Sequence, residues 1–132
     1  MEATLRSWTP ILLSILRFMA GLEILQHGLG KWLKFPPGAY PADLNLNSMA
    51  GYAGIIELVG GILLVLGLFT RPAAFIVSGM CAVGYFLAHA PKGFYPILNK
   101  GELIVLYCFV FLFIAFAGAG PWSLDAWIRK KQ

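Results

Sequence analysis

Charged residues are scarce in this chain, and that scarcity already excludes an ordinary soluble domain. Charged residues make up 12% of the 132 positions and hydrophobic residues 59%, whereas soluble domains average about 25% charged and 45–50% apolar residues. A chain of this length cannot bury so many apolar side chains in a water-soluble core. We therefore expect lipid to surround much of the folded protein.

Cysteine is also scarce, and the motifs of common redox cofactors are missing. The two cysteines, Cys81 and Cys108, lie far apart in separate apolar runs, and no CxxC, CxxCH or glycine-rich dinucleotide motif accompanies them. We interpret them as small packed hydrophobes, with a redox pair between neighbouring helices as the alternative. Two histidines without further ligands do not predict a metal or haem site. The sequence thus predicts no bound cofactor and no metal.

Basic residues outnumber acidic ones by ten to six, which gives a net charge of +4. A basic balance can indicate nucleic-acid binding, but here the cations flank apolar segments. The longest basic run covers only residues 129–131, and basic and aromatic residues do not interleave. Cations next to apolar segments are typical of membrane proteins. We therefore expect the lipid bilayer, and no nucleic acid, as a partner.

Long apolar segments separated by turn residues predict an all-α fold, namely an integral membrane four-helix bundle formed by one domain over residues 1–132. A membrane-spanning helix needs ~20 mostly apolar residues. A short interfacial helix capped by Ser123 is expected near the C-terminus, and Thr70 is expected to cap the third span. The predicted spans are residues 10–33, 52–69, 73–90 and 102–118.

The same segments predict a multi-pass protein of the bacterial inner (cell) membrane. The first segment is too long and carries too many charges for a cleaved signal peptide. Four spans place both termini on one side, and a small excess of basic residues on that side favours cytoplasmic N- and C-termini. The longer loops would then be extracytoplasmic.

Polar residues gather in one half of the predicted bundle. Glu23, His27 and Lys31 are four residues apart in 22-LEILQHGLGKW-32, so they share one helix face. Alternating helix directions place further polar residues in the same half of the bilayer, whereas Arg17 lies in the opposite half and is expected to pair with a carboxylate or to extend inward. The candidate ligand-binding or polar-network residues are Glu23, His27, Lys31, Glu57, His89, Asn99 and Glu102.

Two interpretations of these seven residues stay open. Ionisable groups inside a membrane are costly, so they pair with one another or serve a function. One interpretation is a structural network that fixes the bundle. The other is a polar pocket, open to the extracytoplasmic side, for a small polar or redox-active ligand. Histidines that titrate near neutral pH, next to desolvated carboxylates, would suit proton-coupled quinone chemistry.

Several short motifs together resemble the DoxX family of small membrane proteins. They are the HGxxK end of the first span, the ExxGG start of the second, the LFTR turn, the NxGE start of the fourth and the GxGPxSLD exit. The resemblance implies a four-helix bundle in the bacterial inner membrane with a link to redox biology. It associates relatives with thiosulfate:quinone or quinol oxidation, with quinone and thiol stress, and with partners such as sulfurtransferases.

These observations lead to three hypotheses. The first is a membrane subunit of a quinone- or thiol/sulfur-linked redox system that binds its ligand in the polar cluster. Such a protein is at most an oxidoreductase subunit, because it needs a redox partner protein to carry electrons. The second is a small-solute transporter or exporter. The third is a non-catalytic structural subunit, and exposed glycine faces would also permit a homo-oligomer.

Overall fold

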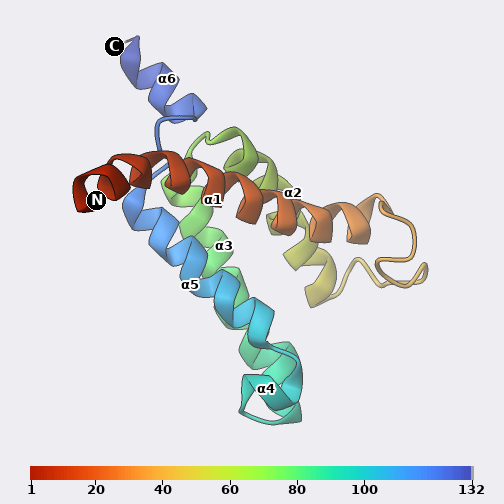
Figure 1. The fold of residues 1–132 in the computed structure, drawn as a ribbon. Coiled ribbons are helices and arrows are strands. Elements are labelled where there is room, and N and C mark those ends of the chain that lie inside the picture. The colour runs from red at the N-terminus through yellow and green to blue at the C-terminus, as the bar shows by residue number, and fades with distance from the viewer. Residues whose placement is uncertain (132) are drawn as a thin grey trace.

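The computed structural model describes residues 1–131, and every regular element in that range is helical (Figure 1). No strand occurs among these residues, as the sequence predicts. In chain order the elements are α1 (Glu2–Trp32), α2 (Met49–Leu66), α3 (Thr70–Gly84), the π-helix η1 (Tyr85–His89), the 3₁₀-helix η2 (Ala90–Lys92), α4 (Pro96–Asn99), α5 (Glu102–Ala117) and α6 (Leu124–Lys130).

The long helices form two antiparallel pairs. α1 packs along α2, and α3 packs along α5, while α2 and α3 share a smaller contact. In Figure 1 the first pair runs to the right and the second runs downward. The two pairs therefore splay apart toward the ends that carry the 34–48 loop and α4. The apolar core lies where they meet, around Leu64, Val77, Phe111 and Ile114, all of which are 0% exposed.

Small residues allow α1 and α2 to approach closely. A Cβ atom at Gly28 would lie 2.8 Å from the Leu58 Cα, and one at Gly61 would lie 2.7 Å from the Leu25 Cα. No real side chain fits at such distances, so glycine is required at both positions. The glycine-containing face of α2 thus packs against α1, as is common between membrane helices.

Three stretches of helix are long and apolar enough to cross a membrane: Glu2–Trp32, Met49–Leu66 and Thr70–Lys92. The third of these continues from α3 through η1 and η2. α5 is apolar but has only 16 residues. At ~1.5 Å per residue it extends about 24 Å, less than the ~30 Å hydrocarbon core. A fourth complete span therefore stays a prediction.

Arg17 connects three segments at the end of the molecule opposite the splayed ends. Its side chain is 2% exposed, and its guanidinium donates hydrogen bonds to the carbonyl oxygens of Leu64, Ala119 and Trp122. The expected carboxylate partner is thus replaced by backbone carbonyls. The Leu64 carbonyl is in the last turn of α2, and Ala119 and Trp122 lie in the segment between α5 and α6, where no helix ladder satisfies their carbonyls.

The start of α3 is held by a residue from the far end of the chain. Phe69, and not the predicted Thr70, occupies the N-cap position and makes no side-chain cap. The Asp125 carboxylate instead accepts hydrogen bonds from the backbone nitrogens of Phe69 and Thr70, both at 2.9 Å. Asp125 lies in α6, which Ser123 caps by accepting a bond from the Ala126 nitrogen. The interfacial position of α6 stays a prediction.

Candidate functional site

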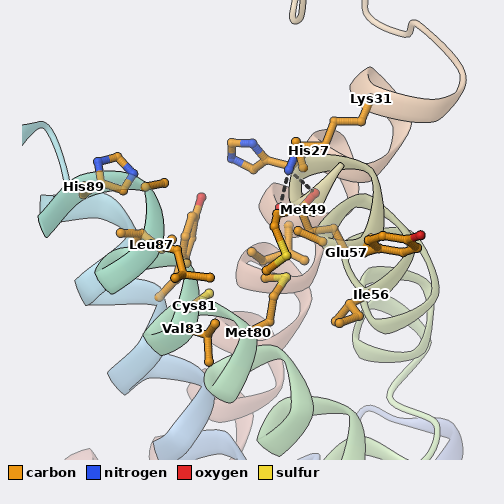
Figure 2. A pocket seen from close by; sticks show the side chains of 18 of the residues that line it. His27, Lys31, Met49, Ile56, Glu57, Met80, Cys81, Val83, Leu87 and His89 are labelled. Carbon is orange, nitrogen blue, oxygen red and sulfur yellow. Dashed lines mark hydrogen bonds and ion pairs between the residues drawn. The ribbon is translucent and has the colours of Figure 1, made fainter. Parts of the chain in front are cut away.

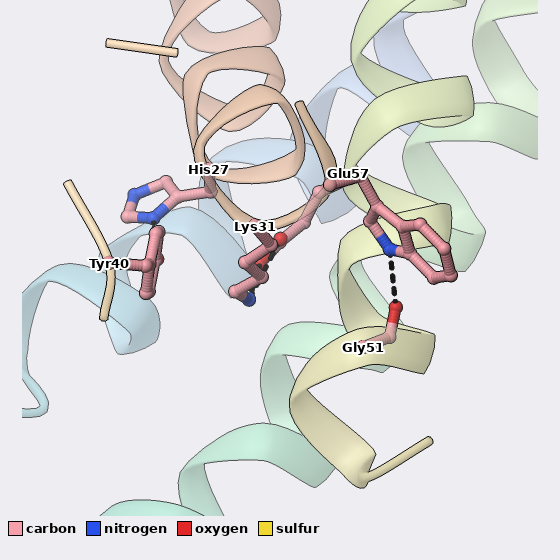
Figure 3. A network of polar contacts seen from close by, with 6 residues as sticks. His27, Lys31, Tyr40, Gly51 and Glu57 are labelled. Carbon is pink, nitrogen blue, oxygen red and sulfur yellow. Dashed lines mark hydrogen bonds and ion pairs between the residues drawn. The ribbon is translucent and has the colours of Figure 1, made fainter. Parts of the chain in front are cut away.

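An ion pair joins the last turn of α1 to the middle of α2 (Figure 3). The Lys31 ammonium lies 2.8 and 3.0 Å from the two oxygens of the Glu57 carboxylate. The two side chains are only 10% and 9% exposed. Sequence spacing placed both residues in one half of the bundle, and the antiparallel α1–α2 packing brings them into direct contact. Each charge therefore neutralises the other in a buried position.

Tyr40, in the loop between α1 and α2, covers this ion pair. Its hydroxyl lies 2.6 Å from His27 Nδ1, and the Lys31 ammonium lies 5.3 Å from the centre of its ring, within cation–π range. The Trp32 indole nitrogen donates to the Gly51 carbonyl at 2.9 Å and so joins the end of α1 to the start of α2 (Figure 3). The 34–48 loop is thus a structured wall of the site.

The Tyr40 phenol should remain protonated well above neutral pH. Burial, with a smaller contribution from the Glu57 carboxylate, raises the pKa of Tyr40 from 10.0 to about 12. Because the folded state holds this proton more tightly, its contribution to stability is present below pH 10 and is lost as pH rises toward 12. The difference between the ultraviolet titration curves of the wild type and of Tyr40→Phe should have its midpoint near pH 12. A midpoint near 10 would contradict the packed position of this ring.

A cleft of about 690 Å³ opens between the two helix pairs. Figure 2 shows His27 and Lys31 on one side and His89 on the other, with Met80 and Cys81 deeper in the cleft. The walls are mostly apolar and the polar groups lie toward the splayed end. The apolar lining includes Met49, Tyr52, Ile56, Ile76, Val83, Leu87, Leu103 and Ile104.

His89 lies on the π-helix that continues α3, and this helix type is frequent at functional sites. Its Nδ1 lies 3.0 Å from the Asn99 carbonyl oxygen. The buried Asn99 amide donates to the Tyr85 hydroxyl at 3.1 Å and to the Gly93 carbonyl at 2.6 Å, and its oxygen accepts from the Gly101 nitrogen at 2.8 Å. Asn99 therefore shapes the turn that carries His89 and does not line the cleft.

The two remaining predicted residues lie outside the cleft lining. Glu23 is exposed on α1, and its nearest polar contact is the Tyr107 hydroxyl at 3.5 Å. Glu102 is exposed in the first turn of α5. Of the seven candidates, the structure brings Lys31 and Glu57 into contact and places His27 and His89 around the same cavity. Whether any of the seven binds a ligand stays a prediction.

Sequence reasoning missed two tyrosines at this site. Tyr40 belongs to a proline-rich loop, and no periodicity indicates that the loop folds back over α1. Tyr107 lies in the most apolar segment of the chain, and its ring contacts the His27 ring edge-on at a centroid distance of 6.3 Å. A phenol inside an apolar span was an available signal, since buried tyrosine hydroxyls usually have a polar partner.

The two cysteines are free thiols in different surroundings. Cys81 is buried and lines the floor of the cleft. Cys108 is half-buried, and its backbone carbonyl accepts a 2.7 Å hydrogen bond from the Ser78 hydroxyl. Among residues 1–131, no group of three or more His, Cys, Asp or Glu side chains is arranged to hold a metal ion.

Comparison with known proteins assigns the chain to a family. The DoxX family model matches residues 12–90. One uncharacterized protein of Haemophilus influenzae is 44% identical over 131 residues, covering 96% of this chain and 98% of the relative. Another from the same organism is 32% identical, covering 89% and 83%. An uncharacterized membrane protein of Mycobacterium tuberculosis is 26% identical, covering 88% and 80%. No solved structure matches significantly. The chain is a membrane protein that belongs to the DoxX family.

Proposed function

We propose that this protein binds a quinone, or another small lipid-soluble redox compound of the thiol/sulfur class, as the membrane subunit of a redox system. The observation that carries the proposal is the cleft itself. It combines apolar walls with a set of donors and titratable groups at one end. Ligand sites are typically concave and mostly apolar, with a few convergent polar groups.

The cleft walls indicate that the ligand enters from the lipid. Met49, Tyr52, Ile76 and Leu103 line the cleft and are each more than half exposed, at 62, 57, 56 and 52%. All four belong to helices that we place in the bilayer, so their exposed surfaces would face lipid. A ring with an apolar tail could slide between α2 and α3 with its polar ring atoms toward His27 and Lys31.

The polar end of the cleft suits proton-coupled chemistry. Lys31 and Tyr40 can donate hydrogen bonds to a quinone oxygen, and the imidazole rings of His27 and His89 can donate or accept a proton. Quinone reduction also consumes electrons, which would have to come from a partner protein or from a thiol or sulfur compound. In this proposal the chain holds the ligand and supplies protons, and its partner carries the electrons.

The proposed topology has four spans in the cell membrane, with α5 as the fourth. Both termini would then be cytoplasmic, and the cleft would open in the extracytoplasmic half. Support comes from the short turn after α2, which makes α3 its antiparallel neighbour, and from Lys130 and Lys131 near the C-terminus. The bilayer can thin locally around the 16-residue α5 at modest cost.

The packing of the core favours binding over transport. A transporter requires a route from the cleft to the opposite membrane face. Below the cleft, Leu64, Val77 and Phe111 are fully buried against one another, and Arg17 is engaged with backbone carbonyls. These contacts support a cleft that is closed at its inner end. A proteoliposome flux assay that detects solute movement would favour the transporter hypothesis instead.

Gly79→Phe should block the cleft without disturbing the fold. Gly79 lines the cleft, and a Cβ atom there would meet nothing within 4 Å. The added ring should therefore occupy the ligand volume and weaken binding of a short-chain ubiquinone analogue by at least about tenfold. Binding can be followed by tryptophan fluorescence quenching of the protein in lipid nanodiscs.

Val59→Phe is the matched control for this experiment. Val59 is 53% exposed on α2 and lies outside the cleft lining. It should bind the analogue like the wild type. Equal affinity of both variants, or no saturable binding by the wild type, would overturn the proposal for quinones. A parallel titration with thiosulfate and a small thiol tests the sulfur alternative.

A further inference from the structure

The outer face of α1 carries two polar side chains among apolar ones. Glu23 and Gln26 are both exposed, and they share one side of the helix with Leu12, Ile15 and Met19, which are 57, 44 and 47% exposed. At ~100° per residue these five positions fall within a single stripe. We call these five residues the α1 stripe. Figure 1 shows α1 in front of its neighbours, with no other helix lying over it.

Glu23 and Gln26 lie beside the second half of α2, between the levels of Leu58 and Leu64. The flanking glycines of α1 fix this position, because Gly21 contacts Leu64 and Gly28 contacts Leu58. The stripe's polar groups are therefore beside a membrane-spanning helix and within its length. At that depth lipid offers no hydrogen-bond donor or acceptor, so exposed polar side chains are costly. The 3.5 Å contact from Tyr107 is at the limit of a hydrogen bond and leaves most of the carboxylate free.

We propose that a second copy of this chain covers the α1 stripe in the membrane. In a parallel α1–α1 contact about a two-fold axis, each Glu23 carboxylate would accept a hydrogen bond from the partner's Gln26. The two residues are one turn apart on the same face, so the arrangement is self-complementary and forms twice. Leu12, Ile15 and Met19 would continue the contact at the three- and four-residue spacings that place residues on one helix face.

A second copy fits better than a different protein or lipid. All copies insert in one orientation, which a parallel two-fold contact requires. The stripe presents an acceptor together with its own donor, and a partner helix with a cation would leave the Gln26 amide unmatched. None of the five stripe residues lines the cleft, although His27, one turn from Glu23, does. The dimer therefore does not depend on the proposed ligand site and leaves that site open.

Cross-linking in membranes tests the contact directly. Met19→Cys should give a disulfide-linked dimer on oxidation in native membranes, at a level well above the wild type with its two native cysteines. Phe109→Cys is the matched control, because Phe109 is 63% exposed on α5 away from the stripe, and it should stay monomeric. Equal cross-linking at both positions, or none at Met19→Cys, would overturn the proposal.

Substitutions of Glu23 separate a specific contact from non-specific crowding. In energy-transfer measurements on labelled protein in liposomes, Glu23→Leu should weaken dimerisation on the order of fivefold, since interhelical hydrogen bonds contribute roughly 1 kcal/mol each. Glu23→Gln should retain the dimer, because an amide can also accept from Gln26. If both variants dimerise like the wild type, or if the purified wild type is monomeric and cross-links only to other proteins in cells, the homodimer is wrong.

Discussion

Glu57→Leu should lower the free energy of unfolding by about 3–5 kcal/mol, the usual cost of removing one member of a buried ion pair. The carboxylate is the partner of the Lys31 ammonium at 2.8 Å, and both side chains are about nine-tenths buried. Without it, the ammonium stays in an apolar position with only the Tyr40 ring nearby. The effect can be measured by denaturant or thermal unfolding in a mild detergent, followed by circular dichroism.

A double variant shows whether the Lys31–Glu57 ion pair serves stability alone or also ligand binding. Lys31→Met combined with Glu57→Leu removes both charges and should recover most of the lost stability, because buried ion pairs often tolerate replacement by apolar residues. Lys34→Met, at a nearby exposed lysine, should change little. A double variant that is stable but no longer binds the quinone analogue would assign the pair to ligand binding. A double variant as unstable as Glu57→Leu alone would contradict the electrostatic explanation.

Arg17→Leu should be comparably destabilising, by at least about 3 kcal/mol, because hydrogen bonds from a charged donor contribute roughly 1.5–3 kcal/mol each. The variant would remove the donors that the guanidinium now provides to the carbonyls of Leu64, Ala119 and Trp122. Arg17→Lys should be intermediate, because one ammonium cannot reproduce the planar, divergent donors of a guanidinium. Unfolding in detergent measures both changes.

Arg6→Leu provides the comparison for a change of charge alone. Arg6 is exposed near the N-terminus, and its substitution should alter stability by no more than about 0.5 kcal/mol. If Arg17→Leu were as mild as Arg6→Leu, the carbonyl network would not hold the α1, α2 and C-terminal segments together. Limited proteolysis of the segment after α5 gives an independent readout, with faster cleavage expected in Arg17→Leu.

The amino-acid sequence by itself determined the helical class, the membrane environment and the approximate position of each long helix. These properties depend on local features, namely long apolar runs, and proline, glycine and asparagine between them. The four-residue spacing of His27 and Lys31 likewise fixed their shared face on α1, because helix geometry is the same in any context.

Only the tertiary structure decided which polar groups meet. Glu23 and Lys31 are equivalent in spacing, yet Lys31 is buried against Glu57 while Glu23 is exposed, because α2 packs nearer the Lys31 side of α1. Arg17 binds carbonyls of segments distant in sequence, and Tyr40 reaches His27 from a loop without periodicity. Such contacts depend on the relative angles of helices and on the path of loops. Those angles arise from packing between residues far apart in the chain. A local sequence pattern therefore does not specify them.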